Sequence, residues 1–478
     1  MKSTTSPNML AKYASARTAV LALSALSALL VGCTTPPATK TPVLALPGAF
    51  SQTQATASMA RLDGDWWRLF ADPALDALVD AAAKNNLDLR LAVLRVDETM
   101  AVLGLTQAAR LPSLDAGAGF TQSRSSALTG LAGGGVETSS HRLALSTSFE
   151  VDLWGKLRNA NAAAQAQLVA SGHALDVVHM ALVSGTAQAY FGLRSLDALI
   201  ALNAQAQTSR RQMLDIVQRR ADGGVASPLE VAQSRAALAA VATQAPELQR
   251  QRGLLENQLA ALTGQHGQRV AAVATALPHP LVPPAGLPSQ LLARRPDIAQ
   301  AEAQLRAAQI QIEVARSAMW PSLSLTASFG AQSNDLLNLL NAGARIWSIG
   351  PSLLLPLFDG GRTKARTDQA RAQAEQAAVA YAKAAQLAFQ QTADALVQAE
   401  QGAAQEAAAA QQRVAAVEVQ RVAKWRYEAG YSGYLEVLDA ERGLQDAEAG
   451  LLRARALRLD ASVGLIKALG GGWTATSR

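Results

Sequence analysis

The chain has little of what most enzymes use for chemistry. Its 478 residues include one cysteine and five histidines, and only 4% of them are aromatic. The histidines show no spacing typical of a metal site. There is no Ser- or Cys-centred nucleophile motif, and the run Gly133–Gly135 lacks the flanking strand and helix of a phosphate-binding loop. We therefore predict that the protein is not an enzyme and needs no metal or other cofactor.

Charge of one sign is not concentrated anywhere along the chain. The formal net charge is +6, yet lysines and arginines are scattered among glutamates and aspartates in helical stretches. A nucleic-acid-binding protein would gather basic residues on one face, with aromatic residues among them. We therefore expect no nucleic-acid partner and interpret these charges as ordinary solvated helix faces.

The N-terminus contains an apolar run from Ala19 to Val31, preceded by positive residues. The run is too short for a permanent transmembrane helix and is typical of a secretory signal over residues 1–32. The sequence Leu30-Val31-Gly32-Cys33 resembles the lipobox of bacterial lipoproteins. The resemblance implies acylation of Cys33, followed by a lipid-anchored tether over residues 33–64. We find no later segment apolar and long enough for a transmembrane helix, so only strands are expected to cross a membrane.

The chain is built as two copies of one plan. The segment Arg110–Leu114 (RLPSL) recurs as Met319–Leu323 (MWPSL) after 209 positions. The segment Gly224–Val231 (GVASPLEV) recurs as Gly430–Val437 (GYSGYLEV) after 206 positions. A near-constant displacement over such a span predicts an internal duplication.

The duplication sets the expected domain organisation. We place the first structural repeat at residues 65–264, a proline-rich linker at 265–288, the second repeat at 289–470 and a C-terminal tail at 471–478. The predicted elements are a helix (Pro73 to Arg110), a β-hairpin (112–154) and a helical hairpin (156–264), then a helix, a β-hairpin (321–358) and a helical hairpin (361–470).

Two stretches without proline predict very long helices. Residues 156–222 and 362–428 each keep a helical pattern for about 65 residues, or roughly 100 Å at 1.5 Å per residue. Ser227, Pro228 and Glu230 then supply an N-cap, a proline at the first helical position and a capping-box glutamate for a returning helix. Helices of this length favour coiled-coil-like packing.

Each predicted hairpin has strands in which apolar and polar residues alternate. Such hairpins usually cover a soluble core on their apolar face. These strands, however, have about ten residues, the length of a tilted membrane strand. Trp320 and Trp347 lie at or near strand ends, where aromatic girdles occur. With the lipobox-like segment, this favours membrane strands.

Four strands are too few to close a membrane barrel, and open sheet edges are not tolerated in lipid. Several chains must therefore pool their hairpins. Two protomers would give eight strands and a filled lumen, whereas three would give twelve strands and room for an aqueous pore. The strand count alone leaves this number open.

Several short motifs, in their order and spacing, resemble those of the TolC-like outer-membrane factor family, and in particular its lipoprotein (NodT-type) branch. The motifs are Trp66-Trp67, Phe70–Pro73, Asn86–Leu89, Leu291–Ile298 (LLARRPDI), Trp320–Leu323 and Leu355–Arg362 (LPLFDGGR). The resemblance covers nearly all of the mature chain. It implies a mainly α trimer with a small membrane β part. Each two-repeat protomer would add four strands to a shared 12-stranded β-barrel, and long helices to a periplasmic α-barrel.

The resemblance implies the outer-membrane channel component of a tripartite efflux pump, which exports drugs or other small molecules. The chain would assemble as a homotrimer. Its partners would be a periplasmic membrane-fusion adaptor, an inner-membrane transporter of the RND type and outer-membrane lipid. Two alternatives stay open. One is the same channel fold serving protein secretion or metal export, and the other is a lipid-anchored periplasmic adaptor without a pore.

The resemblance also suggests site residues. It implies a periplasmic gate in which Asp439 faces the pore axis while Arg426 and Tyr427 link neighbouring helices. The alternative is that these are ordinary charges on a solvated face. The first repeat differs, since Ala221 and Gln233 stand at the positions of Tyr427 and Asp439. The turns that would contact the adaptor comprise Val225, Ala226, Ser227, Tyr431, Ser432 and Gly433.

Overall fold

The computed structural model describes residues 64–126, 128, 135–267, 269–272, 277–281 and 291–473. The predicted signal, the acylation of Cys33 and nearly all of the tether lie outside the described residues, as do much of the linker and the last residues of the tail. The described chain is mainly helical with one four-stranded sheet, which confirms the predicted fold class.

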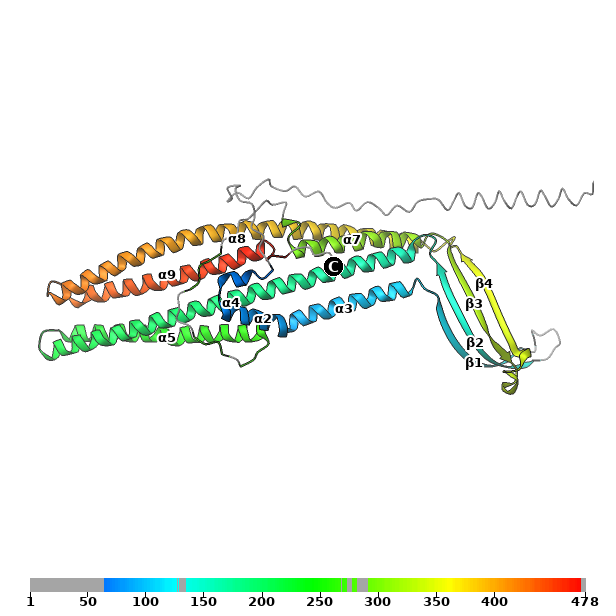
Figure 1. The fold of residues 1–478 in the computed structure, drawn as a ribbon, viewed down its shortest axis with the longest axis horizontal. Coiled ribbons are helices and arrows are strands. Elements are labelled where there is room, and N and C mark those ends of the chain that lie inside the picture. The colour runs from blue at the N-terminus through cyan, green and yellow to red at the C-terminus, as the bar shows by residue number, and fades with distance from the viewer. Residues whose placement is uncertain are drawn as a thin grey trace, which may run out of the picture. The chain divides into compact units, whose positions relative to one another are not determined.

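The elements follow the predicted order twice over (Figure 1). The first half contains η1 (Trp66–Phe70), α2 (Pro73–Asn85), α3 (Leu87–Ala108), β1 (Ser113–Arg124), β2 (Glu137–Val151), α4 (Lys156–Asp222) and α5 (Pro228–Thr263). The second contains α7 (Pro296–Ser317), β3 (Ser322–Ser333), η2 (Leu336–Asn338), η3 (Ala342–Ala344), β4 (Arg345–Leu354), α8 (Arg362–Glu428) and α9 (Tyr434–Ala468).

The chain forms two compact units that do not coincide with the two sequence repeats. Within the described residues, one unit comprises residues 105–163 and 308–374 and contains the sheet. The other comprises residues 64–104, 164–307 and 375–473 and is helical. Each unit takes segments from both halves, because like elements of the two repeats pack beside each other.

The two long helices have the predicted bounds, and each lies beside its returning helix (Figure 1). The turn before α5 has the predicted capping box. The Glu230 backbone N–H donates to Ser227 Oγ at 3.3 Å, and the Ser227 backbone N–H donates to the Glu230 carboxylate at 2.9 Å. This reciprocal pair satisfies two amides that a helix start leaves without partners.

The predicted single helix from Pro73 to Arg110 is wrong, because the chain breaks at Asn86. This residue is extended, with φ −65° and ψ 129°. Its Oδ1 accepts from the Leu89 backbone N–H at 3.0 Å, and its Nδ2 donates to the Leu262 carbonyl at 3.0 Å. One buried side chain therefore starts α3 and ties that start to the end of α5.

The expectation that no later segment has the length and hydropathy of a membrane-spanning helix is wrong for α4, which passes that test. Part of its apolar sequence packs into the main core of the helical unit. Val183, Tyr190 and Phe191 are buried there with Trp66 and Trp67 of η1. Only 22% of the apolar stretch is buried in the protomer, so core packing accounts for part of it and not for the whole.

Candidate functional site

The sheet has one apolar and one polar face. Its order is β1-β2-β3-β4, and every neighbouring pair is antiparallel. The register aligns Ala116, Leu145, Phe329 and Trp347 across the four strands, so these side chains share one face. That face also presents Leu114, Phe120, Leu143, Phe149, Leu325, Ile349 and Leu353, whereas the other presents Asp115, Thr121, Arg142, Ser146, Glu150, Thr326, Ser328 and Ser348.

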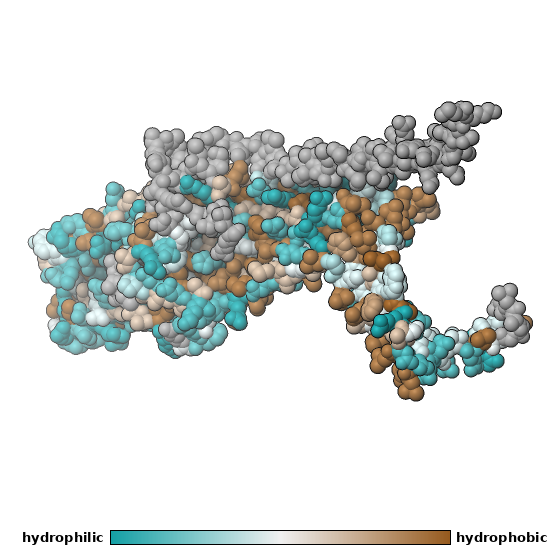
Figure 2. Space-filling view, turned by 45° about the vertical axis from the view of Figure 1, so that its right-hand side comes forward, coloured by the Kyte–Doolittle hydropathy of each residue, from teal (hydrophilic) through white to brown (hydrophobic). Residues whose placement is uncertain are grey.

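The apolar face is exposed in the protomer. Trp347 is 74% exposed, and Phe329 and Ile349 are exposed as well. Figure 2 shows apolar surface along one side of the sheet and polar surface on the other. Alternation between a lipid-facing and a water-facing side is the pattern of a membrane β-barrel wall.

Both outer strands of the sheet have open edges. Among the described residues, β1 pairs only with β2, and β4 pairs only with β3. A row of unpaired N–H and C=O groups cannot remain open to lipid, since each group costs several kcal/mol there. The protomer therefore cannot form a membrane wall alone.

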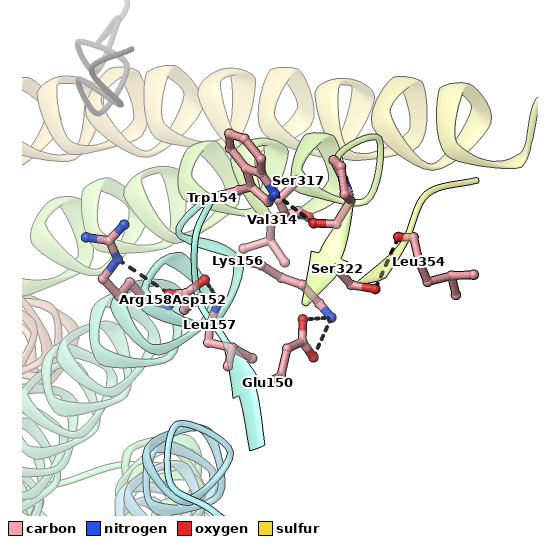
Figure 3. A network of polar contacts seen from close by, with 11 residues as sticks. Glu150, Asp152, Trp154, Lys156, Leu157, Arg158, Val314, Ser317, Ser322 and Leu354 are labelled. Carbon is pink, nitrogen blue, oxygen red and sulfur yellow. Dashed lines mark hydrogen bonds and ion pairs between the residues drawn. The ribbon is translucent and has the colours of Figure 1, made fainter. Parts of the chain in front are cut away.

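The strand ends that connect to helices are fixed by a polar network (Figure 3). Asp152 accepts hydrogen bonds from the backbone N–H groups of Leu157 at 3.1 Å and Arg158 at 2.8 Å, which caps the first turn of α4. Lys156 Nζ lies 2.9 Å from Glu150 Oε1. The junction between β2 and α4 is thus held by side chains from both elements.

Aromatic residues mark both ends of the apolar face. Trp154 Nε1 donates to the Pro321 carbonyl at 2.7 Å, and its ring stacks on Trp320 with centroids 5.1 Å apart. Phe329 lies toward the other end of β3, about 23 Å from Ser322 at 3.3 Å per residue, and Trp347 lies opposite it on β4. Aromatic rings at both margins are typical of membrane strands.

The two helical hairpins turn with the same backbone geometry. The Val225 N–H donates to the Arg220 carbonyl at 2.8 Å, and the Tyr431 N–H donates to the Arg426 carbonyl at 2.8 Å. The glycine before each donor has positive φ, +73° at Gly224 and +78° at the equivalent Gly430. Glycine is favoured here because other residues are strained in this conformation.

The two turns differ in how their glutamates are used. Gly433 stands where the first turn has Ser227, so α9 begins without a side-chain cap. Glu436, the counterpart of Glu230, instead lies 3.4 Å from Arg426. The counterpart of Arg426 is Arg220, whose guanidinium lies over the Tyr427 ring at 4.6 Å.

The predicted gate residues lie near the second turn but do not contact one another as a group. Asp439 is 73% exposed and its Oδ1 lies 3.0 Å from Arg442. Arg426 is half-exposed and pairs with Glu436. Tyr427 is buried within the protomer and packs against Tyr434, with ring centroids 5.8 Å apart. Asp439 and Arg426 are therefore placed at the surface, whereas Tyr427 is part of the packing that holds α8 to α9.

A buried ion pair that was not predicted from the sequence lies close by. Arg210 of α4 pairs with Glu441 of α9, and Tyr434 Oη lies 3.3 Å from Ser234 Oγ of α5. Burial raises the pKa of Glu441, and the nearby Arg210 opposes this rise. Helical spacing could have identified it, since Glu441 lies four residues after the buried Val437 and shares its face.

The tips of both hairpins expose apolar side chains. Of the residues predicted to contact an adaptor, Val225, Ser227, Tyr431 and Gly433 are exposed, while Ala226 and Ser432 are half-buried. Trp425, Leu229 and Leu435 are exposed beside them, and the Trp425 and Tyr431 rings lie 6.2 Å apart. An apolar surface of this kind is typical of a protein-binding site. Within the described residues, no group of three His, Cys, Asp or Glu side chains could hold a metal ion.

A family model described as "Outer membrane efflux protein" matches residues 78–265 and 287–471, one stretch in each half. The chain belongs to this family. It is an outer-membrane efflux protein, and the family is one of transport channels rather than enzymes. This establishes the predicted location in the outer membrane and the predicted role in efflux.

Relatives and solved structures agree with this assignment. The chain is 34% identical over 413 residues to "Solvent efflux pump outer membrane protein SrpC" of Pseudomonas putida, covering 85% of this chain and 87% of the relative. It is 33% identical over 452 residues to "Cation efflux system protein CusC" of Escherichia coli O6:H1, covering 93% and 96%. The open-state structure of the Neisseria gonorrhoeae MtrE outer membrane channel matches with a TM-score of 0.80 and 31% identity, covering 93% of this chain and 100% of that one.

Proposed function

We propose that three copies of the chain form the outer-membrane channel of a tripartite efflux pump. The observation that carries this proposal is the open four-stranded sheet with one apolar and one polar face. Three such sheets, joined β1 to β4, would make a closed barrel of twelve strands with a polar lumen. Two copies would leave a lumen filled by side chains, which does not suit a duct.

The helical unit also supports an oligomer. Helix α3 has a single buried residue, Ala92, although it carries apolar side chains around much of its surface. Leu87, Leu94 and Leu105 are among those exposed in the protomer. A neighbouring protomer covering α3 would remove this apolar surface from water, at about 25 cal/mol per Å².

The partners proposed for the channel are a periplasmic adaptor and an inner-membrane transporter of the RND type. The exposed apolar tips, with Val225 on one turn and Tyr431 on the other, are the proposed adaptor contact. The names of two relatives specify different cargo, solvent for SrpC and cation for CusC, and the chain is almost equally identical to both. We therefore propose that the transporter selects the cargo and the channel conducts drugs or other small molecules.

The proposed gate is a ring of Asp439 side chains, one from each protomer, held in position by the second turn. Exposure of Asp439 on α9 supports this role, because a pore-facing residue must be free of protomer packing. Arg426 and Tyr427 would act as positioning residues for that turn, through Glu436 and Tyr434 respectively. We further propose that a covalent lipid on Cys33 anchors the chain to the membrane.

Cysteine cross-linking across the protomer boundary tests the trimer. Gly119→Cys on β1 would be combined in turn with Ser348→Cys, Gly350→Cys and Ser352→Cys on β4, all on the polar face, with each single variant as control. We expect one combination to give a cross-linked ladder that ends at three chains after mild oxidation. A ladder that continues past three, or stops at two, would contradict the proposal.

A further inference from the structure

A groove of about 380 Å³ lies on the apolar face of the sheet, beneath the connection between β3 and β4. The sheet contributes Leu143, Leu145 and Phe329 to its floor, and the connection contributes Leu339 and Leu340. The lining is thus almost wholly apolar. In a membrane barrel this face is directed toward lipid, so the groove opens where acyl chains are available.

The polar side chains of the groove are Asn341, from the connection, and Arg345, the first residue of β4. Arg345 is exposed, and no carboxylate among the described residues pairs with it. A guanidinium beside an apolar groove has donors for a phosphate and no counter-charge of its own. This combination fits an amphiphile that has an anionic head and an acyl tail.

The height of Arg345 on the sheet agrees with a lipid headgroup. Arg345 lies opposite Ala331, two residues along the strands beyond the pair formed by Phe329 and Trp347. From Leu323 to Ala331 the strand covers about 27 Å at 3.3–3.4 Å per residue. With a tilt of about 40°, this corresponds to about 20 Å of an apolar band about 25 Å tall. Arg345 therefore lies near the margin of the band, at the hairpin-loop end of the sheet.

The outer surface of the connection is itself apolar. Leu337 is 88% and Leu340 is 87% exposed, and Leu336 is exposed beside them. Three neighbouring leucines in water would be unfavourable, whereas hydrocarbon would cover them. The connection and the groove thus belong to one continuous lipid-contacting surface.

We propose that this groove is a binding site for a phosphorylated lipid of the outer leaflet. One acyl chain lies between the sheet and Leu339–Leu340, and the phosphate accepts hydrogen bonds from Arg345. The inference rests on the proposed membrane barrel, and it adds a ligand class and a residue that recognises it.

The test is native mass spectrometry of the purified oligomer with dioleoylphosphatidylglycerol and dioleoylphosphatidylcholine, which have the same chains and differ in net charge. We expect the wild type to retain about one anionic lipid per protomer, and Arg345→Gln to retain it about tenfold more weakly. Arg142→Gln, on the polar face of β2, should retain it like wild type. Leu340→Ser should weaken both lipids alike.

Equal retention of the two lipids by the wild type, or unchanged retention by Arg345→Gln, would overturn the lipid site. Either result with an intact trimer leaves the proposed channel standing. Failure of every variant and of the wild type to form a trimer would instead contradict the proposed function, so the two failures are distinguishable by oligomer mass alone.

Discussion

Arg210 of α4 and Glu441 of α9 form a buried ion pair that joins the long helix of the first repeat to the returning helix of the second. Arg210 Nη1 lies 2.5 Å from Glu441 Oε2, and the two side chains are 6% and 9% exposed. Removing Arg210 leaves the Glu441 carboxylate buried without compensation, which costs about 3–5 kcal/mol. The pair therefore sets how firmly the two helical hairpins are held together near their turns.

Arg210→Met should loosen the start of α9. We expect the backbone amides around Glu441 to exchange faster with solvent, because the free energy of local opening there falls by about 3–5 kcal/mol. The double variant Arg210→Met/Glu441→Leu should exchange much more like wild type, because no charge remains buried. Hydrogen exchange with mass spectrometry measures both. Additive effects of the two substitutions would mean that the pair is not coupled.

The same pair predicts a pH dependence. Burial raises the folded-state pKa of Glu441 above its ordinary value of 4.5, so the closed helices bind a proton more tightly than the opened ones. The stabilising contribution is therefore fully present below about pH 4.5 and is lost as the pH rises through the folded-state pKa. Protection of the α9 start, measured relative to Glu441→Gln, should rise on acidification. If the difference in protection between the wild type and Glu441→Gln did not change between about pH 4 and pH 8, the predicted direction would be contradicted.

Two strand glycines on the polar face offer a matched comparison. A Cβ at Gly330 would overlap the Leu143 carbonyl and approach the Cα of Ala144 to 2.6 Å, whereas a Cβ at Gly350 would meet nothing within 4 Å. We expect Gly330→Ala to reduce assembled oligomer several-fold and Gly350→Ala to leave it unchanged. Unheated gel electrophoresis of outer-membrane extracts measures the yield. Equal yields from both variants would show that the contact between β2 and β3 is not as close as described.

The turns predict a reciprocal effect of capping. Gly433→Ser should create the capping box that Ser227 forms in the first turn, and so draw Glu436 away from Arg426. Because serine and glycine differ by only a few tenths of a kcal/mol as N-caps, the stability gain should be small. Ser227→Ala should cost about 1 kcal/mol at the start of α5. Local hydrogen exchange at the two helix starts checks both expectations.

The sequence predicted regular features well where one strong local signal decided them. Lys156, Asp222, Arg362 and Glu428 bound the long helices as expected, because glycines lie just outside them. The second β-hairpin was predicted to extend to residue 358, but its return strand, β4, runs from Arg345 to Leu354. It ends before Pro356, although it contains Pro351, which an edge strand such as β4 tolerates.

Other features depend on contacts that the linear pattern does not contain. In the sequence, Asn86 looks like an ordinary polar residue of a helix. Its hydrogen bond to the Leu262 carbonyl, which is distant in the sequence, is visible only in the structure. Glu441 and Asp439 are neighbours in one motif, and only packing against Arg210 makes one buried while the other stays exposed. The 3₁₀-helix η1 was not predicted either. Its three aromatic residues are held by the buried cluster that they share with side chains of α4.

We propose that three protomers together form a pore that Asp439 narrows. Single-channel conductance of the purified, unheated oligomer in planar bilayers tests it most directly, with Gln233→Ala, the first-repeat counterpart of Asp439, as the matched control. We predict that the wild type conducts weakly and is mostly closed, that Asp439→Ala conducts several-fold more, and that Gln233→Ala behaves like wild type. An intact oligomer that carries no current, even with Asp439→Ala, would contradict the account.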